Sequence, residues 1–120
     1  MFSDAKFFGT GNLVKAPEIK KVNGTNVCSF IIAVNSGKRE SDEDDAGFVQ
    51  NYYTCSIWTS ADYWMTKLDK GTQVEIVGAL TLDAYVSKKD GQPYVNARVT
   101  VWDMKIRARG KGWKKQEDAA

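Results

Sequence analysis

Residues 52–80, YYTCSIWTSADYWMTKLDKGTQVEIVGAL, change their hydrophobic period twice, and these changes decide the fold. Apolar and polar residues alternate up to position 58, which predicts a β-strand over about 48–58. Apolar side chains then recur at helical spacing from Ala61 to Leu68, and Gly71 ends the predicted helix. Alternation resumes directly after this glycine. The stretch is therefore predicted to form a strand, a helix and a second strand.

The apolar stripe of the predicted helix separates its two large aromatic residues. Trp64 lies on the stripe, so we expect its ring to pack in the core. Tyr63 lies beside the stripe, and we expect it to be half-exposed. At the start of the helix, Ser60 or Thr59 is in position to cap the free backbone N–H groups.

Strand patterns flank this stretch on both sides. Before it, residues 5–14 and 26–35 read as strands, and Pro17 ends the first of them. After the helix, residues 72–106 read as two long strands. A hairpin at residues 90–91, Asp-Gly, joins these two strands, because this pair tolerates the positive φ that such turns require.

The resulting order is three strands, a helix and two strands. A helix between the third and fourth strands is typical of the OB-fold, an all-β, five-stranded antiparallel Greek-key barrel in which the helix plugs one end. Another small β-barrel or a β-sandwich would also be consistent with the periodicity. We expect an OB-fold domain at residues 1–107 and a basic tail without regular structure at residues 108–120.

The composition argues against several kinds of site. The chain has no histidine, and its two cysteines, Cys28 and Cys55, lie in apolar strand patterns without metal-ligand spacing. We therefore expect no metal site, no cofactor and no enzymatic activity, and we expect both thiols to be buried in a reducing compartment. The sequence contains neither an apolar run long enough to span a membrane nor a secretory signal, which favours a cytoplasmic protein.

The net charge is only +2, but the acidic and basic residues are segregated along the chain. Residues 40–45 contain five acidic side chains, whereas residues 105–115 contain six basic side chains and no acidic one. The acidic run is predicted to be a solvated loop. The basic run is either an unstructured tail or an arm that contacts phosphate.

Large aromatic rings occur on strand faces that alternation turns away from the core. Tyr52 and Trp58 bracket small polar residues on such a face of the third strand. Tyr85 and Trp102 lie on the corresponding faces of the fourth and fifth strands. Rings interleaved with hydroxyl, amide and guanidinium groups suit single-stranded nucleic acid, because bases stack on rings and phosphates need donors or cations. A second core or an oligomer interface is the alternative explanation of these rings.

Two blocks of the sequence resemble the bacterial single-stranded DNA-binding protein family. The first, GTGNLVKAPEIKKVNGTNVCSFIIAVNS, contains the family's N-L-x-x-x-P-E pattern and a strand that ends in A-V-N. The second, TCSIWTSADYWMTKLDKGTQVEIVGAL, contains its strand, aromatic residue, helix and K-G-x-x-V signature, with Trp58 at the aromatic position. DGQPYVNARV then resembles its hairpin. The resemblance covers residues 4–106.

The resemblance implies an OB-fold that coats single-stranded DNA during replication, recombination or repair, usually as a homotetramer. At matching positions it implies that bases stack on Tyr52, Trp58 and Tyr85, which alternation also selects. Trp102 and Trp113 are further candidates for stacking. The candidate phosphate contacts are basic residues near the binding face, of which the two at the hairpin tip are best placed: Lys88, Lys89, Arg98, Lys15, Lys20, Lys21, Lys38 and Arg39.

The chain departs from the family in two places. Cellular members end in a Gly/Pro/Gln-rich linker and an acidic tip that recruits partner enzymes, whereas this chain ends ARGKGWKKQEDAA. The missing tip favours a protein of a phage, plasmid or other mobile element, or a specialised paralogue. The basic tail around Trp113 either grips DNA or is unstructured. The acidic run at residues 40–45 would repel phosphate, so we expect a shorter or reoriented DNA path.

The function predicted from the sequence is non-catalytic binding and coating of single-stranded DNA. The alternative is an adaptor of the primosomal type, in which the same rings bind a replication helicase or polymerase. Stacking does not distinguish DNA from RNA, so RNA is a second candidate ligand. We expect a homo-oligomer, a dimer or tetramer, associated with the nucleoid in the cytoplasm and not with a membrane.

Overall fold

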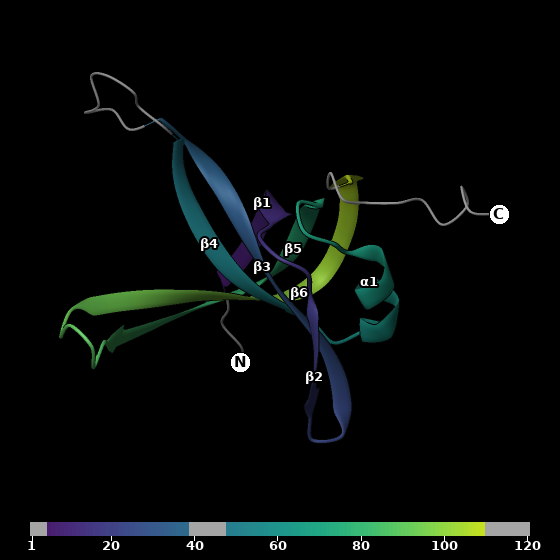
Figure 1. Ribbon diagram of the computed structural model, residues 1–120, viewed down its shortest axis with the longest axis horizontal. Helices are drawn as coiled ribbons and strands as arrows, with labels where there is room; N and C mark the ends of the chain where they lie inside the picture. Colours follow the sequence, from purple (N-terminus) through teal and green to yellow (C-terminus); the bar gives the residue numbers. More distant parts are fainter. Residues whose placement is uncertain (1–4, 39–47, 110–120) are drawn as a thin grey trace.

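The computed structural model describes residues 5–38 and 48–109, which form six strands and one helix (Figure 1). The helix α1 (Ala61–Lys67) lies between the fourth and fifth strands along the chain. No helix in these residues is long and apolar enough to cross a membrane. The strands are β1 (Ala5–Leu13), β2 (Glu18–Val22), β3 (Thr25–Lys38), β4 (Phe48–Ile57), β5 (Gln73–Val86) and β6 (Pro93–Ala108).

Five of these strands close into a barrel. The hydrogen-bonded order is β1, β5, β6, β4, β3, and the ring closes where Asn12 and Leu13 of β1 pair with Ala33 and Ile32 of β3. The pairs are antiparallel except for β4 and β6, which run parallel over residues 54–56 and 98–100. Parallel neighbours require a long crossover, which α1 and β5 provide here. The predicted OB-fold is confirmed, with one parallel seam that the alternation does not reveal.

β2 is the strand that the sequence prediction omits. It pairs antiparallel with the first half of β3, and all of its side chains are exposed. Alternation is therefore absent from it, since neither of its faces covers the core. The sequence does contain a hairpin signal, because Asn23 and Gly24 both adopt positive φ (51° and 81°) between β2 and β3.

The core fills the inside of the barrel and is covered at one end by α1. Trp64 packs against the buried cluster, whereas Tyr63 is exposed to solvent, as the helical stripe predicts. Both cysteines are buried and unpaired. The largest fully buried side chains come from four strands, and they are Leu13, Ile32, Val74, Ile76 and Val99.

The two ends of α1 differ from the prediction. Ser60 occupies the N-cap position, but it has a φ of 59° and its side chain makes no capping hydrogen bond. The helix ends at Lys67 rather than near Gly71, because Leu68 adopts extended backbone and buries its side chain in the core. Gly71 instead forms the turn into β5, where its φ of 87° requires glycine and its N–H donates to the carbonyl of Leu13 at 2.8 Å.

Besides β2 and its partner segment of β3, the outer parts of two further strand pairs extend beyond the barrel (Figure 1). One is the outer part of β3 and β4, and the other is the outer part of β5 and β6 with its turn, residues 81–98, here called the β5–β6 arm. Leu82 continues the inward face of Val74 and Ile76, as alternation predicts. Its side chain is nevertheless 61% exposed, because the β5–β6 arm has left the barrel and no core lies beneath it.

Candidate nucleic-acid interface

One continuous outer face runs across four strands of the barrel. Ile31 of β3 pairs with Thr54 of β4, Thr54 pairs with Arg98 of β6, and Arg98 pairs with Thr81 of β5. Because paired residues lie on the same side of a sheet, their side chains form a row across it. The aromatic residues selected by alternation lie on this same outer face.

The four described candidate rings are all exposed. The exposed fractions are 56% for Tyr52, 44% for Trp58, 46% for Tyr85 and 51% for Trp102. Within residues 5–38 and 48–109, these values rule out a second core as the reason for the rings, and they leave a ligand or an oligomer interface. Trp113, the fifth candidate, lies outside the described residues.

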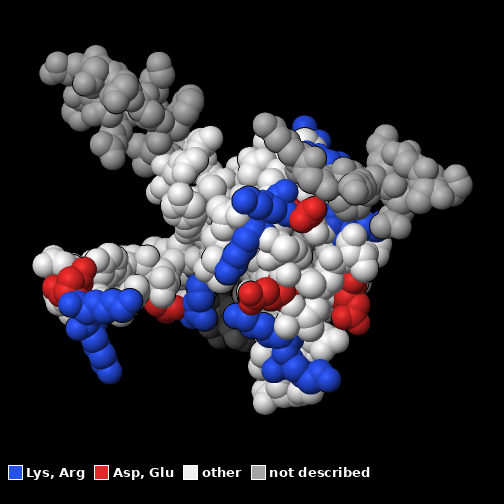
Figure 2. Space-filling model, viewed as in Figure 1, with Lys and Arg blue, Asp and Glu red and all other residues white. Residues whose placement is uncertain are grey.

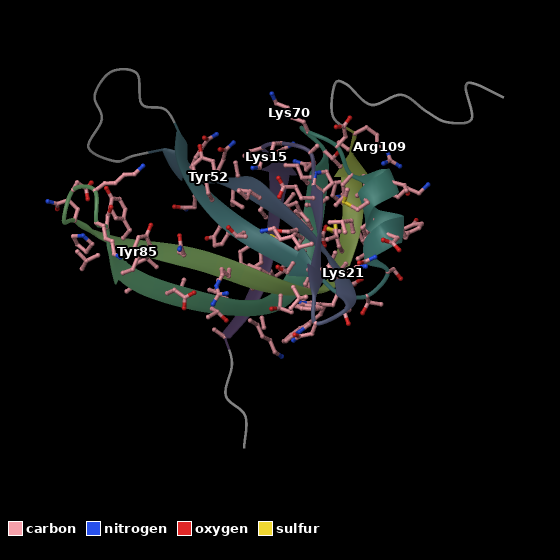
Figure 3. The ribbon with its side chains drawn as sticks, turned by 60° about the horizontal axis from the view of Figure 1, so that its bottom comes forward. Lys15, Lys21, Tyr52, Lys70, Tyr85 and Arg109 are labelled. Atoms are coloured by element: carbon pink, nitrogen blue, oxygen red, sulfur yellow. The ribbon has the colours of Figure 1, made fainter. Side chains whose placement is uncertain are left out.

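The rings lie at separate positions along the outer face. Figure 3 shows Tyr52 on β4 and Tyr85 far out on the β5–β6 arm. Trp58 directly follows β4, and the Tyr52 hydroxyl donates a hydrogen bond to Oε1 of Gln50 at 2.9 Å. Trp102 lies in β6 at a bulge opposite residues 77–78, which lets both it and Asp103 face solvent.

Tyr85 on the β5–β6 arm packs against a second aromatic ring. Its ring stacks on Tyr94 of β6, with 5.8 Å between ring centroids and an interplanar angle of 27°. The Tyr94 hydroxyl donates to Oδ2 of Asp90 in the turn at 2.6 Å. This hydrogen bond lowers the pKa of Asp90 and raises the pKa of Tyr94. A base that stacks on Tyr85 would therefore meet an already ordered pair of rings.

The sequence analysis selects Tyr85 but does not identify Tyr94 as its partner. The turn joins residues 86 and 93, and Gly91 adopts the predicted positive φ of 72°. Asp90 does not adopt a positive φ. Residues 87–92 connect the two strands, which is longer than the two-residue turn that Asp-Gly alone would form. Only the register of the two strands shows which residues face each other.

The candidate lysines whose side chains are described lie in three regions. Lys88 and Lys89 are exposed in the turn of the β5–β6 arm, and Lys15 is exposed between β1 and β2. Lys20 pairs with Val27 on the side of the outer face. Lys21 pairs with Asn26, whose side chain contacts Asp62 of α1, so the register turns Lys21 to the other side. Figure 2 shows basic side chains both at the tip of the β5–β6 arm and over the body of the molecule.

Arg98 differs from the other candidate cations because it has an acidic partner. Its Nη2 lies 2.6 Å from Oδ2 of Asp83 on the neighbouring strand, and both side chains are about half exposed. A phosphate must compete with this carboxylate for the guanidinium. The sequence analysis lists Arg98 as a candidate phosphate contact but does not identify Asp83 as its partner. The side chain of Lys38 and all of Arg39 lie outside the described residues, as does the acidic run.

A groove separates β4 from the β5–β6 arm. Its volume is about 600 Å³. The strands diverge here because β4 and β6 pair only at residues 54–56 and 98–100. The groove is lined by residues of β3, β4, β5 and β6, namely Ile31, Gln50, Asn51, Tyr52, Tyr53, Thr54, Leu80, Leu82, Val95, Asn96 and Ala97.

The described part of the chain offers no evident reactive centre. Burial raises the pKa of Cys28 to about 11 and that of Cys55 to about 12, so both thiols are protonated at neutral pH. Among residues 5–38 and 48–109, no three His, Cys, Asp or Glu side chains group together as metal ligands. The outer face offers rings for stacking, polar groups for hydrogen bonds and charged groups for ion pairs.

The fold is similar to solved structures of proteins that bind single-stranded DNA. A small single-stranded DNA-binding protein from Streptomyces coelicolor superposes with a TM-score of 0.71 at 18% identity, over 88% of this chain and 96% of that one. An SSB from Plasmodium falciparum, in complex with ssDNA, superposes with a TM-score of 0.65 at 20% identity, over 89% and 99%. At these identities the likeness shows the fold alone.

Comparisons of the amino-acid sequence, unlike those of the fold, bear on the family. A search of curated proteins finds no match. The model of the single-strand binding protein family matches residues 5–107, which include α1, the β5–β6 arm and every barrel strand except the last residue of β6. The chain therefore belongs to the single-strand binding protein family.

Proposed function

We propose that this protein binds single-stranded DNA without catalysis, by stacking bases on the outer face of the barrel. The observation that carries the proposal is the exposure of Tyr52, Trp58 and Tyr85 on one face, interleaved with small polar side chains. Exposed rings of this size are otherwise unfavourable in water, and each can contribute about 1 to 3 kcal/mol of stacking per base. We propose the same stacking role for Trp102 and Trp113, which lie nearer the carboxyl end of the chain.

Phosphate contacts complete the proposed site. Lys88 and Lys89 lie at the tip of the β5–β6 arm, and Lys20 lies on the outer side of β2. Lys15, Lys21, Lys38, Arg39 and Arg98 are further proposed contacts. Of these, Arg98 must first leave Asp83, and Lys21 could reach the strand only around the edge of β2, because it lies on the other side. Because these cations displace condensed counterions, binding should weaken as salt rises.

Membership of the family supports a proposal for the cellular role. We propose that the protein coats exposed single strands in DNA replication, recombination or repair, in the cytoplasm at the nucleoid, as a homo-oligomer. A phage, plasmid or other mobile element is the proposed setting. An OB-fold adaptor that binds a replication helicase or polymerase is the alternative, in which the exposed rings serve a protein interface.

Tryptophan fluorescence tests the proposal directly. Oligo-dT should quench the fluorescence saturably at low salt, and duplex DNA of matched sequence should quench it little. Trp58→Ala should weaken binding by about 1 to 3 kcal/mol, because one stacked base loses its ring. Tyr63→Ala is the control, since Tyr63 is equally exposed but lies on α1 away from the outer face.

Two results would contradict the proposal. If oligo-dT at low salt neither quenches fluorescence nor binds, the rings serve a protein interface and the adaptor becomes the better explanation. If oligo-dT binds but Trp58→Ala leaves the affinity unchanged, the stacking role assigned to Trp58 is wrong.

A further inference from the structure

A carboxylate lies in the middle of the face proposed for DNA. Asp83 of β5 is held by Arg98 on the neighbouring strand, and both side chains are about half exposed. A phosphate that passes here is repelled by Asp83, and an ion pair this exposed contributes too little to stability to explain the residue. A carboxylate is also a strong acceptor of hydrogen bonds, and the N–H groups that DNA offers to an acceptor belong to its bases. Asp83 is therefore placed to contact a base.

The strand register places an amide directly across from this carboxylate. Asn96 of β6 pairs with Asp83 of β5, so both side chains lie on the outer face. The Cβ atoms of such a pair lie about 4.5 to 5.5 Å apart, which makes the amide and the carboxylate neighbours. Within residues 5–38 and 48–109, the Asn96 side chain has no hydrogen-bond partner. The outer face therefore presents an acceptor and a free donor side by side.

The stacked rings of Tyr85 and Tyr94 lie next to this acceptor and donor. They are two residues further along each strand, which corresponds to about 7 Å, and the residues between point to the other face. The Tyr94 hydroxyl donates to Asp90 in the turn, so this ring is directed toward the turn and not over Asn96. Asn96 is exposed and Asp83 is about half exposed. A base that contacts the rings can therefore reach both polar side chains with one edge.

Guanine fits this arrangement better than the other bases. Its Watson–Crick edge carries two neighbouring donors, N1–H and the N2 amino group, followed by the acceptor O6. The carboxylate of Asp83 can accept from both donors, and the amide of Asn96 can donate to O6. Adenine and cytosine offer this edge only one donor. Thymine places its O2 acceptor where guanine has the amino group, and two acceptors that face each other repel.

We propose that Asp83 and Asn96 select guanine at one position of the bound strand. The inference rests on the proposed binding of single-stranded DNA and adds a base preference to it. With guanine bound, Arg98 keeps its contact with Asp83 and holds the carboxylate in place, whereas with another base it is free to turn to phosphate. Stacking on Tyr52 and Trp58 remains tolerant of sequence.

The test uses oligo-dT of one length in which isolated thymines are replaced by guanine, hypoxanthine, adenine or cytosine, with binding followed by fluorescence anisotropy. Hypoxanthine differs from guanine only by lacking the N2 amino group, so it presents one donor to Asp83 and not two. Wild type should bind the guanine oligonucleotide about five-fold more tightly than the hypoxanthine one. Asp83→Asn should abolish most of this ratio, while its affinity for unsubstituted oligo-dT is retained or rises. Differences between the free oligonucleotides cancel when two proteins are compared.

Glu75→Gln is the matched control. Glu75 is also an acidic residue of β5 that pairs with an arginine, Arg107, but it lies at the other end of the strand, away from the β5–β6 arm. It should leave the ratio of guanine to hypoxanthine affinity unchanged. A role of Asp83 that is limited to holding Arg98 would also leave this ratio unchanged in Asp83→Asn.

Asn96→Ala provides a second, independent variant. It should weaken binding of the guanine and hypoxanthine oligonucleotides to a similar extent, because both bases keep the O6 acceptor. If the oligonucleotides bind but wild type does not prefer guanine to hypoxanthine, or Asp83→Asn keeps the preference, the base-reading role is overturned while DNA binding stands. Tighter binding of the adenine or cytosine oligonucleotide than of the guanine one would overturn the choice of guanine. If wild type binds no oligonucleotide, the proposed function fails and the inference fails with it.

Discussion

At the scale of single residues, the ion pair between Arg98 and Asp83 tunes the proposed site. Arg98 lies in the middle of the outer face, beside Thr54 and Thr81. The carboxylate of Asp83 holds its guanidinium and adds a negative charge where a phosphate would pass. Because both side chains are about half exposed, we expect the pair itself to contribute little to stability, about 0 to 1 kcal/mol.

We therefore predict that Asp83→Asn strengthens binding of single-stranded DNA. The amide removes the repulsion and frees Arg98 for phosphate, so affinity at low salt should rise by up to about five-fold. The dependence of log affinity on log salt should steepen by about one, because one more cation displaces counterions. Titrations of oligo-dT at several salt concentrations measure both effects. An unchanged affinity and slope would show that the DNA path does not reach Arg98.

At the scale of elements, β5 and β6 must approach closely where they leave the barrel. The register shifts between Val77 and Gly78, and this bulge permits β6 to bend. A Cβ atom at Gly78 would clash with the backbone carbonyl oxygen of Thr100 and lie 2.9 Å from Val99 Cγ1. The obstruction is backbone, which cannot rotate away as a side chain can.

Gly78→Ala should therefore destabilise the whole domain. We expect the free energy of unfolding to fall by at least about 2 kcal/mol, since overpacking beside a buried strand forces the backbone to shift. Urea denaturation followed by circular dichroism measures this change. Gly91→Ala is a useful comparison, because nothing lies within 4 Å of its Cβ position and only its positive φ of 72° opposes the substitution. Equal stability of wild type and Gly78→Ala would contradict the observed strand approach.

On the β5–β6 arm, the contribution of the lysines to DNA binding can be tested separately from that of the aromatic rings. Replacing Lys88 and Lys89 together by alanine should weaken DNA binding and reduce the salt slope by up to about two, because two phosphate contacts are lost. The free energy of unfolding should not change, since both side chains are exposed in the turn. The double variant Lys70→Ala, Lys105→Ala is the control with the same loss of charge. A similar loss of affinity in the control would indicate a general effect of net charge.

At the scale of the whole molecule, β1 presents an incomplete edge. In the described chain it pairs with β5 along residues 5–12, but with β3 only at residues 12–13. Phe7 packs on Tyr53 at a centroid distance of 4.7 Å and belongs to the core, whereas Phe8 is 72% exposed. An open edge beside an exposed phenyl ring favours pairing with another strand, as the expected dimer or tetramer would provide.

We predict that wild type is a homo-oligomer and that Phe8→Glu has a lower mass in solution. The added charge would repel an identical chain at this edge while the fold is retained, because the side chain lies outside the core. Light scattering over a range of concentrations gives the mass, and circular dichroism checks the fold. A monomeric wild type, or an unchanged mass in Phe8→Glu, would refute this prediction.

The sequence by itself determined the type and order of most elements and the direction of the aromatic rings. Alternation is local, since successive strand side chains point to opposite faces wherever the strand lies. It therefore identified Tyr52, Trp58 and Tyr85 as outward residues, and the helical stripe identified Trp64 as a core residue. β2 was missed because a strand exposed on both faces has no alternation, although Asn23-Gly24 signals its turn.

Only the tertiary structure determined whether each strand face contacts the core, another side chain or solvent. Alternation assigned Leu82 to the inward face correctly, but whether a core lies beneath it depends on where β5 leaves the barrel. The pairing of Arg98 with Asp83 and the stacking of Tyr85 on Tyr94 depend on strand register. The groove exists because two strands that are distant in sequence diverge after three paired residues. Such contacts depend on the closure of the whole barrel, which no local pattern encodes.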